Sequence, residues 1–471
     1  MSAADLPRRL SDTEAAFAYT HALMAGTTQV TTRLSLGEAV PDGVVERAVQ
    51  RWARDLPLLR LRIEERPDGL WFREAPGAAA ERVRHGAPPG ARGPDDVLRA
   101  ELNDVLPTGG PLWRLRVVRE ARETHLFFTR NHAISDGHST GAVLRALLDH
   151  LPGPPVPPAA GAGPFEDVRR LPPDADALEY LPPAAPAAGS AAVPVPVPAA
   201  GSVPAPVPAP APIPFDATAR WADRSADFTT LDLSVEETGR LRSRCRAAGV
   251  SVNQFLGAAL AESWTRVTGR ADVRLLTAVS LRGRHPGPLP DVGCFISVAG
   301  VPVEPHAAGT DETARRYGAA LRDADARWRP PRRGHAEIRR AVARTAEAAE
   351  APGICLTNVG VADTAFGAHA GRVTGFRTVV NRTGGNYALV LHAATFAGAL
   401  SLALAHGVPA TRPATVRAVA RELRARLSEP GSEPVAALTG PAVAAPRVTP
   451  AAGPVPAGRG SARRIPAAGA G

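Results

Sequence analysis

The residues best suited to chemistry run from His132 to Gly137 and read His-Ala-Ile-Ser-Asp-Gly. Residues 125–130 before them are mostly apolar and rich in β-formers, and residues 137–151 repeat apolar side chains at helical spacing. We therefore expect His132 at the end of a strand, in the loop that opens a helix. Because an imidazole has an ordinary pKa of about 6.5, a histidine exposed there to a substrate could act as a general base. The alternative is a structural histidine in a turn.

The surrounding pattern predicts an α/β fold that could hold this loop. Capping boxes, in which a serine and an acidic or amide residue three positions later bond each other's backbone amides, mark helix starts at Ser11, Ser234 and Ser251. Apolar spacing predicts helices over residues 42–55 and 411–427. Short β-forming runs predict strands over residues 29–36, 58–65, 70–73, 111–118, 124–130, 273–281, 354–359 and 371–380.

Residues 386–407 carry no Asp, Glu or Arg and are long enough to resemble a membrane span. The stretch breaks at Phe396-Ala397-Gly398, however, and each half alternates as a strand does. We therefore predict a buried β-hairpin and no transmembrane segment. Its two histidines, His392 and His406, are expected to be structural.

A change of composition divides the chain. Residues 182–214 are almost entirely Ala, Pro, Val and Gly, which favours an extended linker, although such a segment could also be a ligand for a proline-recognising partner. We predict an N-terminal subdomain over residues 1–181 that contains the His132 loop, and a C-terminal subdomain over residues 215–427. Residues 428–471 are rich in Pro, Ala and Gly and are expected to be a disordered tail.

The composition argues against several classes of function. All 55 basic residues are arginine, against 46 acidic ones, and Arg, Ala, Gly and Pro are abundant together, which indicates codon bias more than a nucleic-acid surface. The three cysteines form no Cys-x-x-Cys pair and no histidines have metal-ligand spacing, so we expect no metal and a reducing compartment. The first residues lack an apolar signal region, which favours a cytoplasmic location.

With these elements in place, the chain resembles the condensation-domain and acyltransferase superfamily, whose mark is His-His-x-x-x-Asp-Gly. Its stand-alone polyketide-associated members, of the phthiocerol dimycocerosyl transferase type, are the most similar. The matching segments occur in the family's order along most of the chain: residues 10–14, 56–60, 111–114, 131–137, 279–282, 293–295 and 357–360.

This resemblance implies a chloramphenicol-acetyltransferase-like fold, with two pseudo-symmetric halves, mixed sheets flanked by helices, and an active-site tunnel between the halves. It implies that His132 is the general base. Asp136 could orient His132, but the family pattern instead pairs this Asp with the Arg of its Ser-Leu-Arg segment, here Arg282. We accordingly expect Asp136 and Arg282 to be structural, and Gly137 to allow close packing at the helix start.

Several positions at the site leave alternatives open. Asn131 replaces the family's first His and is expected, with Asn358, to line the tunnel; the replacement could also mark a degenerate member. Asn358 could help to bind an oxyanion or could be a turn residue. Cys294 is expected to be a buried core thiol, and His138 to pack or to face solvent.

The function that the resemblance implies is acyl transfer from a thioester, on CoA or an acyl carrier protein, to a hydroxyl or amine acceptor, with ester formation favoured. CoA or the carrier is then a co-substrate, and no cofactor is required. Such a reaction belongs to secondary metabolism or lipid biosynthesis. The alternatives are a degenerate module that binds a carrier protein without turnover, and an amide-forming condensation enzyme.

Overall fold

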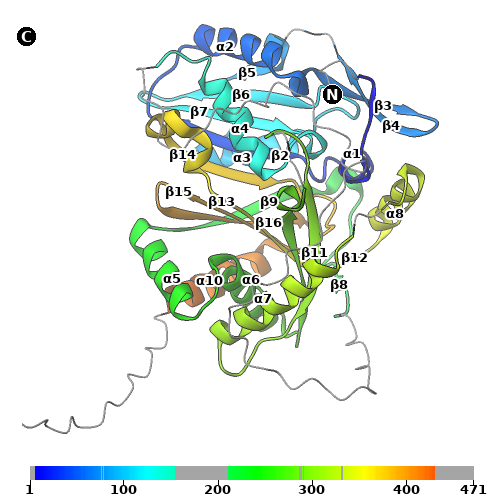
Figure 1. Ribbon diagram of the computed structural model, residues 1–471, viewed down its shortest axis with the longest axis vertical. Coiled ribbons are helices and arrows are strands. Elements are labelled where there is room, and N and C mark those ends of the chain that lie inside the picture. Colours follow the sequence, from blue (N-terminus) through cyan, green and yellow to red (C-terminus); the bar gives the residue numbers. More distant parts are fainter. Residues whose placement is uncertain are drawn as a thin grey trace, which may run out of the picture. The chain divides into compact units, whose positions relative to one another are not determined.

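The computed structural model describes residues 6–75, 77, 79–153, 210–285, 289, 291–329 and 332–429. The predicted disordered tail lies outside these residues apart from Ser428 and Glu429, and so does most of the predicted linker. The described chain is built on two larger mixed sheets with helices packed on them (Figure 1). The expected α/β class with two halves is therefore confirmed.

The N-terminal half contains a five-stranded sheet in the order β14-β2-β7-β6-β5 and a small sheet in the order β1-β4-β3. Its elements are β1 (Arg8–Arg9), α1 (Asp12–Leu23), β2 (Val30–Leu36), α2 (Asp42–Asp55), β3 (Leu61–Arg66), β4 (Gly69–Glu74), β5 (Val83–His85), α3 (Pro94–Asn103), β6 (Trp113–Arg119), β7 (Thr124–Arg130) and α4 (Gly137–Leu148).

The C-terminal half contains a six-stranded sheet in the order β11-β10-β13-β15-β16-β9, and β8 pairs separately with β12. Its elements are β8 (Ile213–Pro214), β9 (Ser225–Leu233), α5 (Val235–Ala247), α6 (Val252–Thr268), β10 (Val273–Ser280), β11 (Ile296–Val303), α7 (Thr310–Arg327), α8 (His335–Glu347), β12 (Glu350–Ala351), β13 (Ile354–Val361), α9 (Asp363–Phe366), β14 (Val373–Val380), β15 (Val390–Phe396), β16 (Ala399–Val408) and α10 (Pro413–Ser428).

Strand β14 crosses from the C-terminal half to the edge of the N-terminal sheet. It pairs antiparallel with β2, from Val380 opposite Val30 to Val373 opposite Leu36. Figure 1 shows β14, in yellow, beside the blue and cyan elements of the other half. The two halves are therefore interlocked, and residues 373–380 belong structurally to the first sheet although they follow residue 215.

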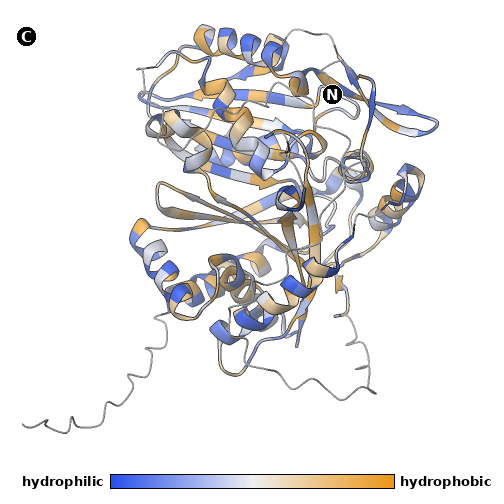
Figure 2. Cartoon of the chain, viewed as in Figure 1, coloured by the Kyte–Doolittle hydropathy of each residue, from blue (hydrophilic) through white to orange (hydrophobic). Residues whose placement is uncertain are grey.

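Local sequence signals account for many of these elements. The capping boxes at Ser11, Ser234 and Ser251 are all formed, and α2 begins and ends where its apolar spacing predicts. Helix α2 alternates between hydrophobic and hydrophilic residues (Figure 2) and buries Val45, Val49 and Trp52. Burying such a face against a sheet is what stabilises a short amphipathic helix in water.

The predicted hairpin is confirmed. Strands β15 and β16 pair antiparallel and turn at Ala397 and Gly398, both with positive φ. No helix among the described residues is both long and apolar enough to cross a lipid bilayer.

One local prediction is corrected, and two helices were not predicted. The strand predicted over residues 58–65 begins only at Leu61, because Pro57 opens a 3₁₀ turn over Pro57–Arg60. Helices α7 and α8 were not predicted, although their core side chains recur at helical spacing, Tyr317 and Leu321 in α7 and Ile338 and Val342 in α8.

Candidate functional site

The His132 loop lies where the sequence predicts, between the end of β7 and the start of α4. Residues His132–Ile134 form a 3₁₀ turn. Asn131 is buried, and its side-chain oxygen accepts a hydrogen bond of 3.0 Å from the Ala133 amide. Asn131, which was expected to line a tunnel, therefore caps this turn instead, because its side chain is used to fix the loop backbone.

Gly137 allows β13 to approach the first turn of α4 closely. A Cβ atom at this position would lie 2.7 Å from Val359 Cγ1, which is closer than two carbon atoms can pack. The role expected for this glycine, close packing at the helix start, is the one that the geometry supports. The contact joins α4 of the N-terminal half to β13 of the C-terminal half.

Asp136 joins the loop to the other half of the molecule. Its carboxylate accepts hydrogen bonds from the Ser139 amide and hydroxyl, both 2.9 Å, from the Phe295 amide at 3.0 Å, and from the Arg282 guanidinium. Burial by itself raises the pKa of this carboxyl, but Arg282 and the amide donors outweigh that effect and lower the pKa. Arg282 is the partner that the resemblance implies. The Asp136 carboxylate bonds to Ser139, Phe295 and Arg282, and it acts on His132 only through its charge, which raises the pKa of the imidazole.

The imidazole of His132 is held between an aromatic ring and a thiol. Phe17 of α1 stacks on it with a centroid separation of 4.1 Å and an interplanar angle of 5°. Cys294 Sγ lies 4.0 Å from His132 Nδ1. Burial, reinforced by the nearby Arg130 cation, lowers the pKa of His132 to about 4, so the ring is neutral at pH 7 and its lone pair is free to take a proton.

A cavity of about 240 Å³ adjoins His132 and is lined by both halves of the molecule. The sequence-predicted residues His132, Asp136, Gly137, Arg282 and Asn358 all contribute to its wall. Asn358 lines the cavity, and its side-chain oxygen accepts a 2.9 Å hydrogen bond from the Gly360 amide, as in a turn residue. Its part in binding an oxyanion stays a prediction. His138 also lines the cavity, with a side chain 54% exposed and 3.4 Å from Asp291.

Sequence reasoning missed two buried residues in this wall, Arg130 and His392. Arg130 ends β7 and is 1% exposed, while His392 of β15 is 3% exposed and its Nε2 has no hydrogen-bond partner. Burial, followed by the charge of Arg382, lowers the pKa of His392 well below its ordinary value. His392 was expected to be structural because it lies within a hairpin, where alternation alone does not reveal which strand face borders a cavity.

A second, more apolar cavity of about 380 Å³ lies between α1, β11 and α8. Its apolar wall consists of Ala16, Phe17, Ile296, Val298, Ile338 and Val342. Ile296 lines both cavities, and Phe17 is the ring that stacks on His132. The imidazole therefore lines the first cavity, and Phe17, which stacks on it, lines the second, which we call the apolar groove.

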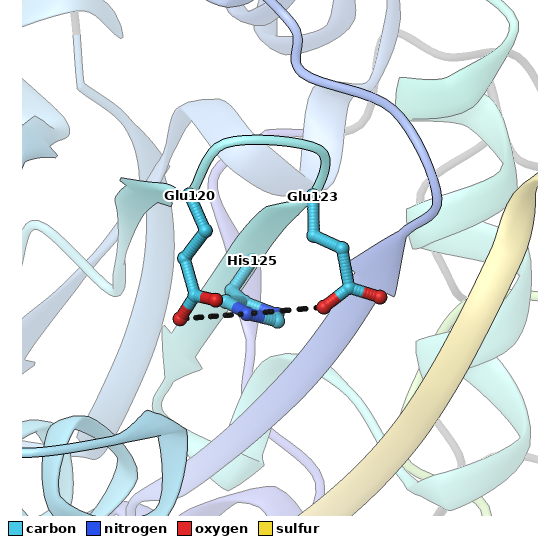
Figure 3. Close-up of side chains that lie close together, drawn as sticks. All are labelled: Glu120, Glu123 and His125. Atoms are coloured by element: carbon cyan, nitrogen blue, oxygen red, sulfur yellow. Dashed lines mark ion pairs between the residues drawn. The ribbon is translucent and has the colours of Figure 1, made fainter.

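Away from the cavity, Glu120, Glu123 and His125 gather at the turn between β6 and β7 (Figure 3). His125 Nε2 lies 3.4 Å from a carboxylate oxygen of Glu120 and 3.7 Å from one of Glu123, and its Nδ1 shares a 2.8 Å hydrogen bond with Ser35 Oγ. Both glutamates are exposed enough to be hydrated. Exposed acidic groups often gather without an ion, and we assign no metal to this cluster.

Comparison with known proteins identifies the fold. Residues 222–395 match the family model of the phthiocerol/phthiodiolone dimycocerosyl transferase C-terminus. The structure of polyketide synthase associated protein 5 from Mycobacterium tuberculosis is similar, with a TM-score of 0.55, 16% identity, and coverage of 91% of this chain and 100% of that one. No curated protein sequence gives a significant match.

Two further solved structures have the same fold. The first condensation domain of the CDA synthetase has a TM-score of 0.57 and 16% identity, covering 91% of this chain and 98% of that one. The epimerization domain from the third module of tyrocidine synthetase B has a TM-score of 0.52 and 15% identity, covering 89% and 96%. The fold that the resemblance implies is therefore confirmed, and the family model matches residues 222–395 of the chain. Because an epimerization domain shares the fold, the fold alone does not select the reaction.

Proposed function

We propose that this chain, which has the condensation-domain fold and the matching C-terminal segment, is an acyltransferase that moves an acyl group from a thioester to a hydroxyl or amine. The observation that carries the proposal is His132, a neutral imidazole fixed by Phe17 at the wall of a cavity lined by both halves. A general base must be deprotonated, held rigidly and reachable by the substrate, and His132 meets these three requirements. Among the cavity-lining residues Asp136 does not compete for this role, because its carboxylate is already fully engaged.

In the proposed reaction, the acceptor's hydroxyl or amine gives its proton to His132 while its oxygen or nitrogen attacks the thioester carbonyl. A tetrahedral intermediate forms and collapses by breaking the carbon–sulfur bond. The imidazolium then returns the proton to the departing thiolate, so the products are an ester or amide and a free thiol. Since the acceptor attacks directly, no covalent acyl-enzyme is needed. A positioned base of this kind contributes about 10²- to 10⁴-fold, and holding both substrates together supplies much of the rest.

The apolar groove beside Phe17 supports the proposal that one of the substrates carries an acyl chain. Its wall of aliphatic and aromatic side chains suits a hydrocarbon, and it adjoins the ring stacked on the proposed base. We propose a donor thioester carried by CoA or by an acyl carrier protein, either of which acts as co-substrate. Ester formation in secondary metabolism or lipid assembly is the favoured outcome, and amide formation would use the same base.

The test is release of free thiol from a panel of acyl-CoAs and acyl carrier proteins, with alcohol and amine acceptors, by the full chain and by His132→Ala. We expect acceptor-dependent thiol release that falls by about 10²- to 10⁴-fold in the variant. His85→Ala is the matched control, because His85 lies in β5, does not line the cavity and contacts only Asp42 and Glu46 in its ion pairs.

Equal rates from wild type and His132→Ala, with near-ultraviolet circular dichroism unchanged, would overturn the assignment of the base. Binding of a carrier protein without any thiol release would instead favour a module that binds carriers and does not turn over.

A further inference from the structure

Arg130 is an unusual residue in the wall of the cavity. It is 1% exposed, and its Nη1 donates a 3.1 Å hydrogen bond to Thr32 Oγ1 while its Nη2 donates to Thr140 Oγ1. Its Nε has no hydrogen-bond partner, and its guanidinium lies 5.4 Å from the centroid of the Phe128 ring. Neutral hydroxyls and an aromatic face contact the guanidinium, and the Asp136 carboxylate raises its pKa through charge alone, without forming an ion pair with it.

Most of the other buried arginines are paired with a carboxylate. Six arginines are buried among the described residues, and four of them form an ion pair with a carboxylate: Arg114 with Glu101, Arg284 with Asp325, Arg372 with Glu38 and Arg377 with Asp95. No ion pair with a described residue is formed by the remaining two, Arg130 and Arg382. Because an unpaired buried charge is strongly unfavourable, a fold retains one where a ligand supplies the missing partner.

The charged groups around the cavity also leave its wall with a net positive charge. Asp136 and Arg282 neutralise each other, and the buried His132 and His392 are neutral at pH 7. Arg130 therefore leaves one uncompensated positive charge on the cavity wall, and Arg382, stacked 5.2 Å from the centroid of the Tyr387 ring, adds another nearby. The cavity is electrostatically suited to one anionic group.

We propose that Arg130 binds a carboxylate of the substrate, so that the acyl transfer proposed above acts on a carboxylate-bearing reactant. A guanidinium presents planar N–H donors that match the two oxygens of a carboxylate, and Arg130 uses only one N–H of each terminal nitrogen on a threonine. A cavity of about 240 Å³ holds a short carboxylated segment beside His132.

The carboxylate could be part of either reactant. On the donor it would make a dicarboxylic acyl thioester, such as succinyl-CoA, and on the acceptor it would make a hydroxy acid or an amino acid. To test the donor, succinyl-CoA is compared with butyryl-CoA, with the same neutral alcohol as acceptor. To test the acceptor, a hydroxy acid is compared with its methyl ester, with the same neutral acyl-CoA as donor.

The experiment measures kcat and KM for these pairs in wild type, Arg130→Met and Arg130→Lys. We expect wild type to prefer the carboxylated member of one pair by at least about 100-fold in kcat/KM, mainly through KM. Arg130→Met, which keeps an unbranched stem as far as the position of Nε but lacks the guanidinium and its charge, is expected to abolish that preference. Arg130→Lys is expected to restore part of it, because it keeps the charge but loses the planar donors.

A turnover-independent measurement keeps this inference separate from the proposed function. Calorimetry with succinate and with its neutral diamide should show binding of the dianion alone, weakened at least about 10-fold by Arg130→Met and retained by His132→Ala. Equal binding of succinate by wild type and Arg130→Met, or a uniform fall in kcat for charged and neutral substrates, would overturn the inference while leaving the acyltransferase intact. A uniform fall would indicate that Arg130 stabilises the oxyanion instead. Carboxylate binding without thiol release from any pair would overturn the proposed function instead.

Discussion

The two ends of the His132–Gly137 loop differ in how their polar groups are satisfied. At one end the Asp136 carboxylate accepts four hydrogen bonds, two of them from Arg282 and Phe295 in the other half of the molecule. At the other end, Arg130 lacks a carboxylate among the described residues, and His132 is held by ring stacking. Since buried polar groups in proteins are normally paired, the saturated end stabilises the fold, and the unsaturated end is the one that we propose to contact substrate.

The largest expected effect on stability is at the saturated end. Asp136→Ala leaves Arg282 without its carboxylate and the backbone amides of Ser139 and Phe295 unpaired, so the free energy of unfolding should fall by about 3–5 kcal/mol. Urea unfolding monitored by tryptophan fluorescence measures this change. Arg282→Met combined with Asp136→Ala should recover part of the loss, because the stranded cation is removed. An unfolding free energy within about 0.5 kcal/mol of wild type would remove the distinction between the two ends.

The pH dependence of catalysis reports on the unsaturated end. Because the pKa of His132 is lowered to about 4, the imidazole remains able to accept a proton from pH 7 down to about pH 5, and kcat/KM should decline only as pH approaches 4. Arg130→Met removes a cation that helps to lower this pKa, so its acid limb should shift to higher pH. A wild-type limb near pH 6.5, with circular dichroism unchanged over the range, would contradict the environment described for His132.

A smaller effect is expected from the ring that positions the base. Phe17→Leu removes an aromatic stack of about 0.5–1.5 kcal/mol, which corresponds to a fall of about 2- to 10-fold in kcat/KM. Phe17→Tyr keeps the stack and serves as the control. Identical kinetics for wild type and Phe17→Leu would show that other contacts fix the imidazole.

The smallest effect is expected at Cys294. Burial raises the pKa of its thiol well above the ordinary value, so it is not ionised at neutral pH and is unsuited to be a nucleophile. Cys294→Ala should change kcat by less than about threefold. A loss as large as that of His132→Ala, together with an acylated Cys294 detected by mass spectrometry, would replace direct attack with a covalent mechanism.

Much of the fold could be predicted because the signals are local. The capping boxes at Ser11, Ser234 and Ser251, the face of α2 and the hairpin of β15 and β16 each depend on residues within a few positions of one another. Helices α7 and α8 were not predicted, although each carries core side chains at helical spacing, Tyr317 and Leu321 in α7 and Ile338 and Val342 in α8, so this signal was present in the sequence. The resemblance supplied the Asp136–Arg282 pair, which composition and spacing do not indicate.

The sequence by itself determined the local elements and the loop between β7 and α4 that carries His132. Only the tertiary structure decided that β14 joins β2, that Phe17 stacks on His132, that His392 shares its cavity, and that Arg130 is buried there without a described carboxylate. The physical reason is the separation along the sequence over which each kind of interaction acts. Backbone capping and side-chain periodicity act within one or two turns, whereas stacking, burial and charge pairing depend on which distant segments the folded chain brings together.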